Sequence, residues 1–194
     1  MPQPLGFFRN LLRRFRRDCR GVTAVEFALV APVFFALLFA IIETALVFFA
    51  SQMLETITQD SARLVLTGQA QGGSLSQEDF KKQVCAHKLI FMFDCNGISV
   101  DVRSYAQSTL VKIPNQIGAD STFINNDMKY CPGQDGSIVV VRLFYQWPVI
   151  IIKMLNVGYN LEYNLSNLSG SKRLLSAVAV FKNEPFPVGG ATCS

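Results

Sequence analysis

The segment Val22–Ile42 constrains the fold more than any other part of the sequence, because it is almost wholly apolar and contains one charged side chain. As a helix its 21 residues would extend ~31 Å, about the thickness of the hydrocarbon core of a bilayer. The charged residue is Glu26, and a plain membrane anchor gains nothing from a carboxylate inside lipid. The segment therefore predicts a transmembrane helix in which Glu26 has a role of its own.

The net positive charge of the chain lies in the residues before this segment. Residues 1–21 hold six arginines and one aspartate, whereas the whole chain has a net charge of only +4. By the positive-inside rule, this tail stays in the cytoplasm and residues from about 50 onward lie outside. Since the positive charge ends at an apolar span, we do not expect a nucleic-acid partner.

Helical periodicity continues beyond the length that a membrane requires. Apolar or small residues recur at spacings of three and four, at Ala50, Met53, Leu54, Ile57, Ser61, Leu64 and Val65. Gly68 is a typical helix stop. We expect one helix from Val25 to Thr67, about 65 Å long, with a kink or local unwinding at Pro32, which cannot donate a backbone hydrogen bond.

The remaining residues predict a small α+β domain. We expect a transmembrane helix at 22–49, an exposed continuation at 50–67, and an extracytoplasmic domain at 68–194. Within that domain, a Ser76-x-x-Asp79 capping pattern starts a helix at about 77–90. Alternation over about 97–105 predicts a half-buried strand, with Ile98, Val100 and Val102 on its apolar face and Ser99, Asp101 and Arg103 on its polar face. A run that is apolar on nearly both faces predicts a central strand at about 137–147, which Pro148 ends, and a third strand is expected at about 174–182. Over 109–136 we expect a loop that contains at most one helical turn. The order of elements favours an antiparallel sheet packed on the exposed half of the long helix.

The apolar stretch 149–155 is either core or a patch for a partner or lipid.

Four of the five cysteines lie beyond the apolar segment, and an even number in an exported domain predicts two disulfides. Three pairings are possible, and we favour Cys85–Cys95 with Cys131–Cys193. Cys19 lies in the arginine-rich tail. Four unpaired buried cysteines are the alternative.

No motif for catalysis or nucleotide binding is present, and the spacing of cysteines does not fit a zinc site. The single histidine, His87, has no accompanying nucleophile or ligand set. We therefore expect no enzymatic activity, no cofactor, no metal and no small-molecule substrate.

Several segments together resemble a known family. The stretch RGVTAVEFALVAPVFFALLFAIIE at 20–43 resembles the processing site and first helix of type IV pilin-like proteins. With SARLVLTGQAQ at 61–71, IVVVRLFYQWP at 138–148 and RLLSAVAVFKNEPF at 173–186, it resembles more closely the TadE-like pseudopilins of tight-adherence (Flp) pilus assembly.

This resemblance implies a pilin-like α+β fold, with a long N-terminal spine helix packed against a small antiparallel sheet, to which the cysteines add the expected disulfides. It also implies cleavage after Gly21 by a prepilin peptidase, which makes Val22 the first residue and Glu26-Phe27 the fifth and sixth. The implied function is structural, in pilus biogenesis, adhesion and biofilm formation. The implied location is the inner (cytoplasmic) membrane, with a periplasmic domain; whether the subunit also enters the pilus is left open. Other pilin-like subunits and the pilus assembly platform are the implied partners.

The chemistry of Glu26 supports the same function independently. Cleavage would expose an α-amine one helical turn from the carboxylate, and the new amine of a neighbouring subunit would pair with Glu26 and fix the helix register. Alternatively, Glu26 extends to the headgroups and has no further role. Glu43, near the outer interface, is weaker evidence. The alternative function is a permanently membrane-anchored extracytoplasmic binding or sensor domain, which would not explain Glu26.

Overall fold

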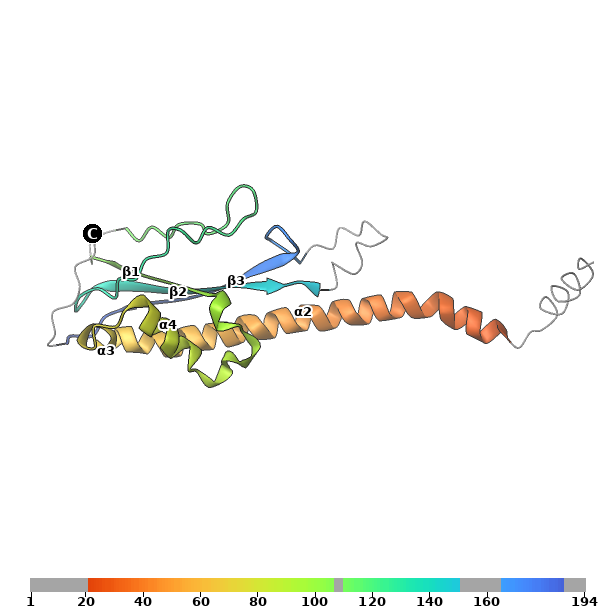
Figure 1. Cartoon of the computed structure of the whole chain (residues 1–194), viewed down its shortest axis with the longest axis horizontal. Helices are drawn as coiled ribbons and strands as arrows, with labels where there is room; N and C mark the ends of the chain where they lie inside the picture. The colour runs from red at the N-terminus through yellow and green to blue at the C-terminus, as the bar shows by residue number, and fades with distance from the viewer. Residues whose placement is uncertain (1–20, 107–109, 151–164, 187–194) are drawn as a thin grey trace, which may run out of the picture. The chain divides into compact units, whose positions relative to one another are not determined.

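The computed structural model describes residues 21–106, 110–150 and 165–186. The chain divides into two units, and the boundary lies between Ile42 and Glu43. Figure 1 shows the order of elements. They are the helices α2 (Val22–Leu66), α3 (Gln69–Gly72) and α4 (Gln77–Cys85), the 3-10 turns η2 (Lys88–Met92) and η3 (Cys95–Gly97), and the strands β1 (Ile98–Tyr105), β2 (Ile138–Pro148) and β3 (Lys172–Lys182).

The long N-terminal helix expected from the sequence is confirmed as α2, which passes through the unit boundary. It ends where the sequence places a glycine, because Gly68 adopts a left-handed conformation with φ of 75°. The Gly68 N–H donates to the carbonyl of Val65 at 3.1 Å. A Cβ at position 68 would lie 2.6 Å from Cγ of Phe186, so both the backbone conformation and the available space require glycine.

The predicted antiparallel sheet is also confirmed, with three strands in the order β1-β2-β3. β2 is the central strand, as its apolar sequence on both faces indicates. It pairs with β1 so that Asp101 lies opposite Arg142, and it pairs with β3 so that Arg142 lies opposite Val178. Its last residue is Pro148, which has no N–H to continue the ladder.

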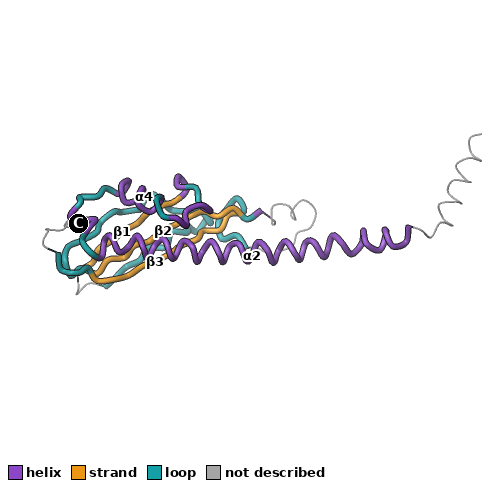
Figure 2. The backbone as a smooth tube through the Cα atoms, turned by 90° about the horizontal axis from the view of Figure 1, so that it is seen from below, coloured by secondary structure: helices purple, strands orange, loops and turns teal. Residues whose placement is uncertain are grey.

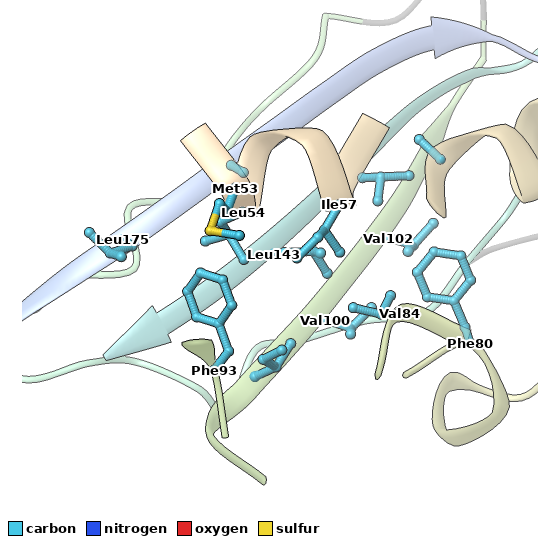
Figure 3. Packing of buried hydrophobic residues seen from close by; sticks show 14 of the residues in the cluster. Met53, Leu54, Ile57, Phe80, Val84, Phe93, Val100, Val102, Leu143 and Leu175 are labelled. Carbon is cyan, nitrogen blue, oxygen red and sulfur yellow. The ribbon is translucent and has the colours of Figure 1, made fainter. Parts of the chain in front are cut away.

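The core of the second unit lies between the sheet and the part of α2 that follows Glu43. Figure 2 shows this part of α2 running along the strands. Met53, Leu54 and Ile57 of α2 point toward Val100 and Leu143 of the sheet (Figure 3). Complete burial of an aliphatic side chain of this size contributes about 1.5–3 kcal/mol. Of the helix positions expected to face the domain, six are buried: Ala50, Met53, Leu54, Ile57, Ser61 and Val65.

The helix expected over 77–90 is shorter than predicted. Ser76 caps it as the sequence pattern indicates, and its side chain accepts a hydrogen bond from the Asp79 N–H. Helix α4 nevertheless ends at Cys85, because His87 has an extended backbone and its Nδ1 accepts the N–H of Leu89 at 3.2 Å. A separate turn, η2, follows.

The chain between β1 and β2 covers the other face of the sheet (Figure 1). Phe123 packs on Phe144 of β2 with ring centroids 5.8 Å apart, and the Arg142 guanidinium donates to the carbonyl of Pro114. In the described part of this connection, 110–137, there is no helix or named strand, in agreement with the predicted loop. The loop therefore covers the outer face of the sheet over β1 and β2, whereas Val178 and Val180 of β3 stay exposed on that face.

Candidate processing and assembly site

The expected processing site lies at the start of α2. The helix begins at Val22, directly after Gly21. Both residues are exposed, and no heavy atom lies within 4 Å of the position that a Cβ on Gly21 would take. Glu26 follows Val22 by four residues, so the two lie on one face of the helix, one turn apart. A cut after Gly21 would therefore place a new amine one turn from the carboxylate.

Glu26 lies in strongly apolar surroundings on its own unit. It is the only Asp, Glu, Lys or Arg between Val22 and Ile42. Glu26 is exposed, and its neighbour Phe27 is 68% exposed. Helix α2 is long and apolar enough to cross a membrane, by length and composition, and its most apolar window has no residue buried. Solvent-exposed apolar side chains in such number fit a lipid environment and not water.

Helical structure continues through Pro32. The proline lacks the N–H that would donate to the carbonyl of Ala28, so one backbone hydrogen bond of the helix is missing at this point. The kink expected here stays a prediction.

Glu43 differs from Glu26 in that it is buried, with 6% of its surface exposed. Its carboxylate oxygen Oε1 accepts a hydrogen bond from the backbone N–H of Ile150, 107 residues later in the chain. The sequence left the role of Glu43 open, because nothing near it in the chain identifies this partner. The structure thus gives Glu43 a role in holding the chain directly after β2.

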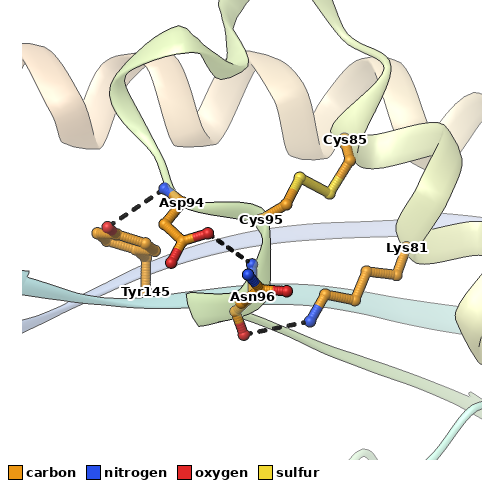
Figure 4. Close-up of a disulfide and its surroundings, with 6 residues drawn as sticks. All are labelled: Lys81, Cys85, Asp94, Cys95, Asn96 and Tyr145. Carbon is orange, nitrogen blue, oxygen red and sulfur yellow. Dashed lines mark hydrogen bonds between the residues drawn. A yellow bond between two sulfur atoms is a disulfide. The ribbon is translucent and has the colours of Figure 1, made fainter.

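One disulfide, Cys85–Cys95, joins the end of α4 to η3. Around it, the Asp94 carboxylate accepts the N–H of Asn96 at 3.0 Å, and Lys81 donates to the carbonyl of Asn96 (Figure 4). The pairing of these two cysteines is the one we favoured. Cys131 is disulfide-bonded as well, whereas Cys193, its expected partner, lies outside the described residues.

A buried ionic cluster was missed by reasoning from the sequence, which placed Asp101 on the polar face of a half-buried strand. Asp101 is fully buried, and its carboxylate accepts from Nη2 of Arg142 at 2.6 Å and from Nε of Arg103 at 3.0 Å. It also accepts the backbone N–H of Lys129 at 2.8 Å. Asp101 of β1 lies directly opposite Arg142 of β2, and this opposite-charge pair could have indicated the cluster. The pair cannot be recognised from the sequence alone, because it depends on how the two strands are aligned.

A second ion pair, between Arg103 and Asp127, completes this cluster on its exposed side. Arg103 donates from Nη2 to the carboxylate of Asp127 at 2.9 Å, and this hydrogen bond lowers the pKa of Asp127. Two arginines and two aspartates thus balance each other's charge. The cluster fixes the long loop on the sheet, since Asp127, Lys129 and the Pro114 carbonyl all belong to that loop.

The structure gives His87 a local structural role. Its Nε2 lies 3.0 Å from Oδ2 of Asp60 on α2, and its Nδ1 accepts the Leu89 N–H. Both ring nitrogens are satisfied by a neutral ring that carries its proton on Nε2. Among the residues that the structure describes, no group of three or more His, Cys, Asp or Glu is placed to hold a metal ion.

Comparison with protein families supports the resemblance seen in the sequence. The family described as TadE-like protein matches residues 21–63, which include Gly21, Val22, Glu26, Phe27 and Pro32. No curated protein and no solved structure matches the chain. The family match points to a component associated with a Tad pilus, and the single apolar helix points to single-pass membrane anchoring. The resemblance to TadE-like proteins is therefore confirmed, and residues 21–63 are the part of the chain that carries it.

Proposed function

We propose that this chain is a pseudopilin of a tight-adherence (Flp) type IV pilus system, which a prepilin peptidase cuts after Gly21. The mature protein starts at Val22 and is held in the inner membrane by the first half of α2. Its domain lies in the periplasm, where it takes part in pilus assembly and thus in adhesion and biofilm formation. The observation that carries this proposal is the placement of Glu26, which is the only charged residue of the apolar segment 22–42 and lies one turn after the expected cut.

The energetics of Glu26 explain why this carboxylate needs a cationic partner. A charged side chain costs about 2.5–3.5 kcal/mol at the centre of a membrane helix on insertion scales, and Glu26, the fifth residue of the span, bears part of this cost. No cationic side chain lies between Val22 and Ile42 to offset this cost. The α-ammonium of a second processed subunit is a cation at a matching depth, and it exists only after cleavage. Pairing would therefore couple processing to assembly and fix the axial register of adjacent helices.

The orientation in the membrane follows from the arginines. Arginine-rich residues 1–21 resist transfer across the bilayer, so they stay on the cytoplasmic side, where a prepilin peptidase would reach Gly21. The disulfide-bonded domain then lies in an oxidising compartment, which is consistent with Cys85–Cys95. The proposed partners are the peptidase, other pilin-like subunits and the assembly platform.

Complementation of a deletion strain tests the proposal. Glu26→Ala and Glu26→Gln should reach the membrane in normal amounts but fail to support pilus assembly, because neither can pair with an ammonium. Glu55→Gln is the matched control, since Glu55 is an exposed glutamate on α2 outside the apolar segment. Membrane fractionation measures insertion, and electron microscopy and surface-adhesion assays measure pili. Normal pili from both Glu26 variants would contradict the assembly role and favour an anchored binding or sensor domain.

A further inference from the structure

Glu43 follows directly after the proposed membrane span 22–42, and it is buried. Glu43 is the first residue of the second unit, and it is buried although the helix residues that follow it include exposed apolar ones. Its carboxylate accepts the N–H of Ile150. A buried carboxylate requires such donors, because desolvation without hydrogen bonds is costly. The bond holds the backbone of Ile150 level with residue 43 of the helix.

The chain leaving β2 is held from a second side as well. Val149, directly after Pro148, is buried, and its N–H donates to the carbonyl of Ser171 at 2.9 Å. Ile150 is the next residue, and 63% of its surface is exposed. The backbone is thus fixed on both sides while the Ile150 side chain points outward.

The exposed surface of α2 near Glu43 is apolar. Leu46, Phe48 and Phe49 are exposed at 44%, 69% and 52%. The next exposed residues are Gln52 and Glu55, so the surface of the helix becomes polar after Phe49. At about 1.5 Å per residue, Phe49 lies ~9 Å beyond Glu43 along the helix. Ile150 is therefore held level with the apolar part of α2, about two turns before its polar part begins.

We infer that Ile150 and the exposed apolar side chains Leu46, Phe48 and Phe49 form a lipid-contacting corner of the second unit, positioned by Glu43. This inference rests on the proposed membrane span. Of the transmembrane helix expected over 22–49, residues 22–42 fill the hydrocarbon core of a bilayer, so residue 43 lies at the outer edge of that core and residues 46–49 at headgroup depth. The occupant is the outer leaflet surface, because these side chains continue the apolar surface of the span. Contact through both α2 and Ile150 would fix the orientation of the domain on the membrane, whereas a single helix leaves it free to rotate.

Tryptophan quenching in vesicles tests this corner. The chain has one tryptophan, Trp147. In a full-length Trp147→Phe background, a single tryptophan is placed by Ile150→Trp, Phe39→Trp or Val178→Trp. Phe39 lies in the proposed span, and Val178 is 44% exposed on β3. Each protein is reconstituted in phosphatidylcholine vesicles whose acyl chains are brominated near the headgroup.

The lipid-contacting corner predicts a large loss of emission for Ile150→Trp, approaching the loss for Phe39→Trp, and little loss for Val178→Trp. Quenching of Phe39→Trp alone would overturn the inference and leave the membrane span intact. Quenching of none of the three would contradict the span itself. As a check without any substitution, the unaltered chain is photolabelled by a carbene-generating lipid and mapped by mass spectrometry. Label on Ile150 supports the inference, and label on Phe39 without Ile150 overturns it.

Discussion

Substitution of Asp101 by asparagine should destabilise the second unit more than any change to an exposed carboxylate. The substitution keeps the shape of the side chain but removes its charge. The side chain of Arg142 is only 4% exposed, and it would lose the carboxylate with which it is paired. The one carboxylate left in this cluster would be Asp127, which is paired with Arg103 and not with Arg142. The change therefore strands a buried cation.

The structure allows the magnitude to be worked out. Asp101 accepts charge-assisted hydrogen bonds from two arginines and a further one from the Lys129 N–H. Breaking a buried ion pair by removing one partner costs about 3–5 kcal/mol. A typical domain has a free energy of unfolding of about 5–15 kcal/mol. Asp101→Asn should thus remove a large fraction of the stability and loosen the loop that the cluster holds.

Urea unfolding of the full-length protein in detergent measures this effect. Trp147 reports on the second unit, because its ring lies 6.3 Å from those of Phe93 and Tyr145. Asp120→Asn is the control, since Asp120 is exposed and its side chain bonds to Thr122 nearby. A loss of less than about 1 kcal/mol in Asp101→Asn would refute the reasoning, because a buried pair that is broken costs several times as much. Combining it with Arg142→Met should cost no more than Asp101→Asn alone, because the stranded cation is gone.

Three further predictions concern stability and its dependence on pH. Replacing Cys85 and Cys95 by serine should lower the free energy of unfolding by about 3 kcal/mol, as measured by the same urea titration, because a loop of ten residues' separation is no longer closed; an unchanged midpoint would contradict this. Burial raises the pKa of Tyr130 to about 12 from 10.0, and its hydroxyl has no hydrogen-bond partner within the described part of the chain. Folding thus favours the protonated hydroxyl, so stability is lost as pH rises from 10 to 12, and Tyr130→Phe should abolish this loss without cost at pH 7, as urea titrations at each pH would measure. The hydrogen bond from Arg103 lowers the pKa of Asp127, so its contribution is present above the ordinary pKa of 3.8 and is lost as pH falls below it; Asp127→Asn should flatten the acid limb of a thermal-unfolding profile.

The sequence predicts the fold well wherever the signal is local or periodic. The three-and-four spacing from Ala50 to Val65 identifies the buried face of α2, and Gly68 marks its end. The alternation of apolar and polar residues over 98–102 identifies the inward face of β1. A run of residues that is apolar on nearly both faces identifies β2 as the central strand. In these elements, side-chain period and backbone geometry determine burial directly.

Reasoning from the sequence failed where partners lie far apart in the chain. Glu43 bonds to Ile150 across 107 residues, and the local sequence around either residue does not identify the other. Asp101 was expected to face solvent because alternation alone cannot show that a long loop covers the outer face of the sheet. The early end of α4 was missed for a different reason, since it depends on the extended backbone at His87. The candidate processing residues Gly21, Val22 and Glu26 could be named from the sequence because their pattern is contiguous.

The mature N-terminus tests the central proposal most directly. Intact-mass analysis with N-terminal sequencing, on protein from cells with and without the cognate prepilin peptidase, identifies the first residue. The proposed function predicts a chain beginning at Val22 when the peptidase is present and a chain that keeps residues 1–21 when it is absent. A chain that keeps residues 1–21 in cells with active peptidase would contradict processing, and with it the assembly role of Glu26.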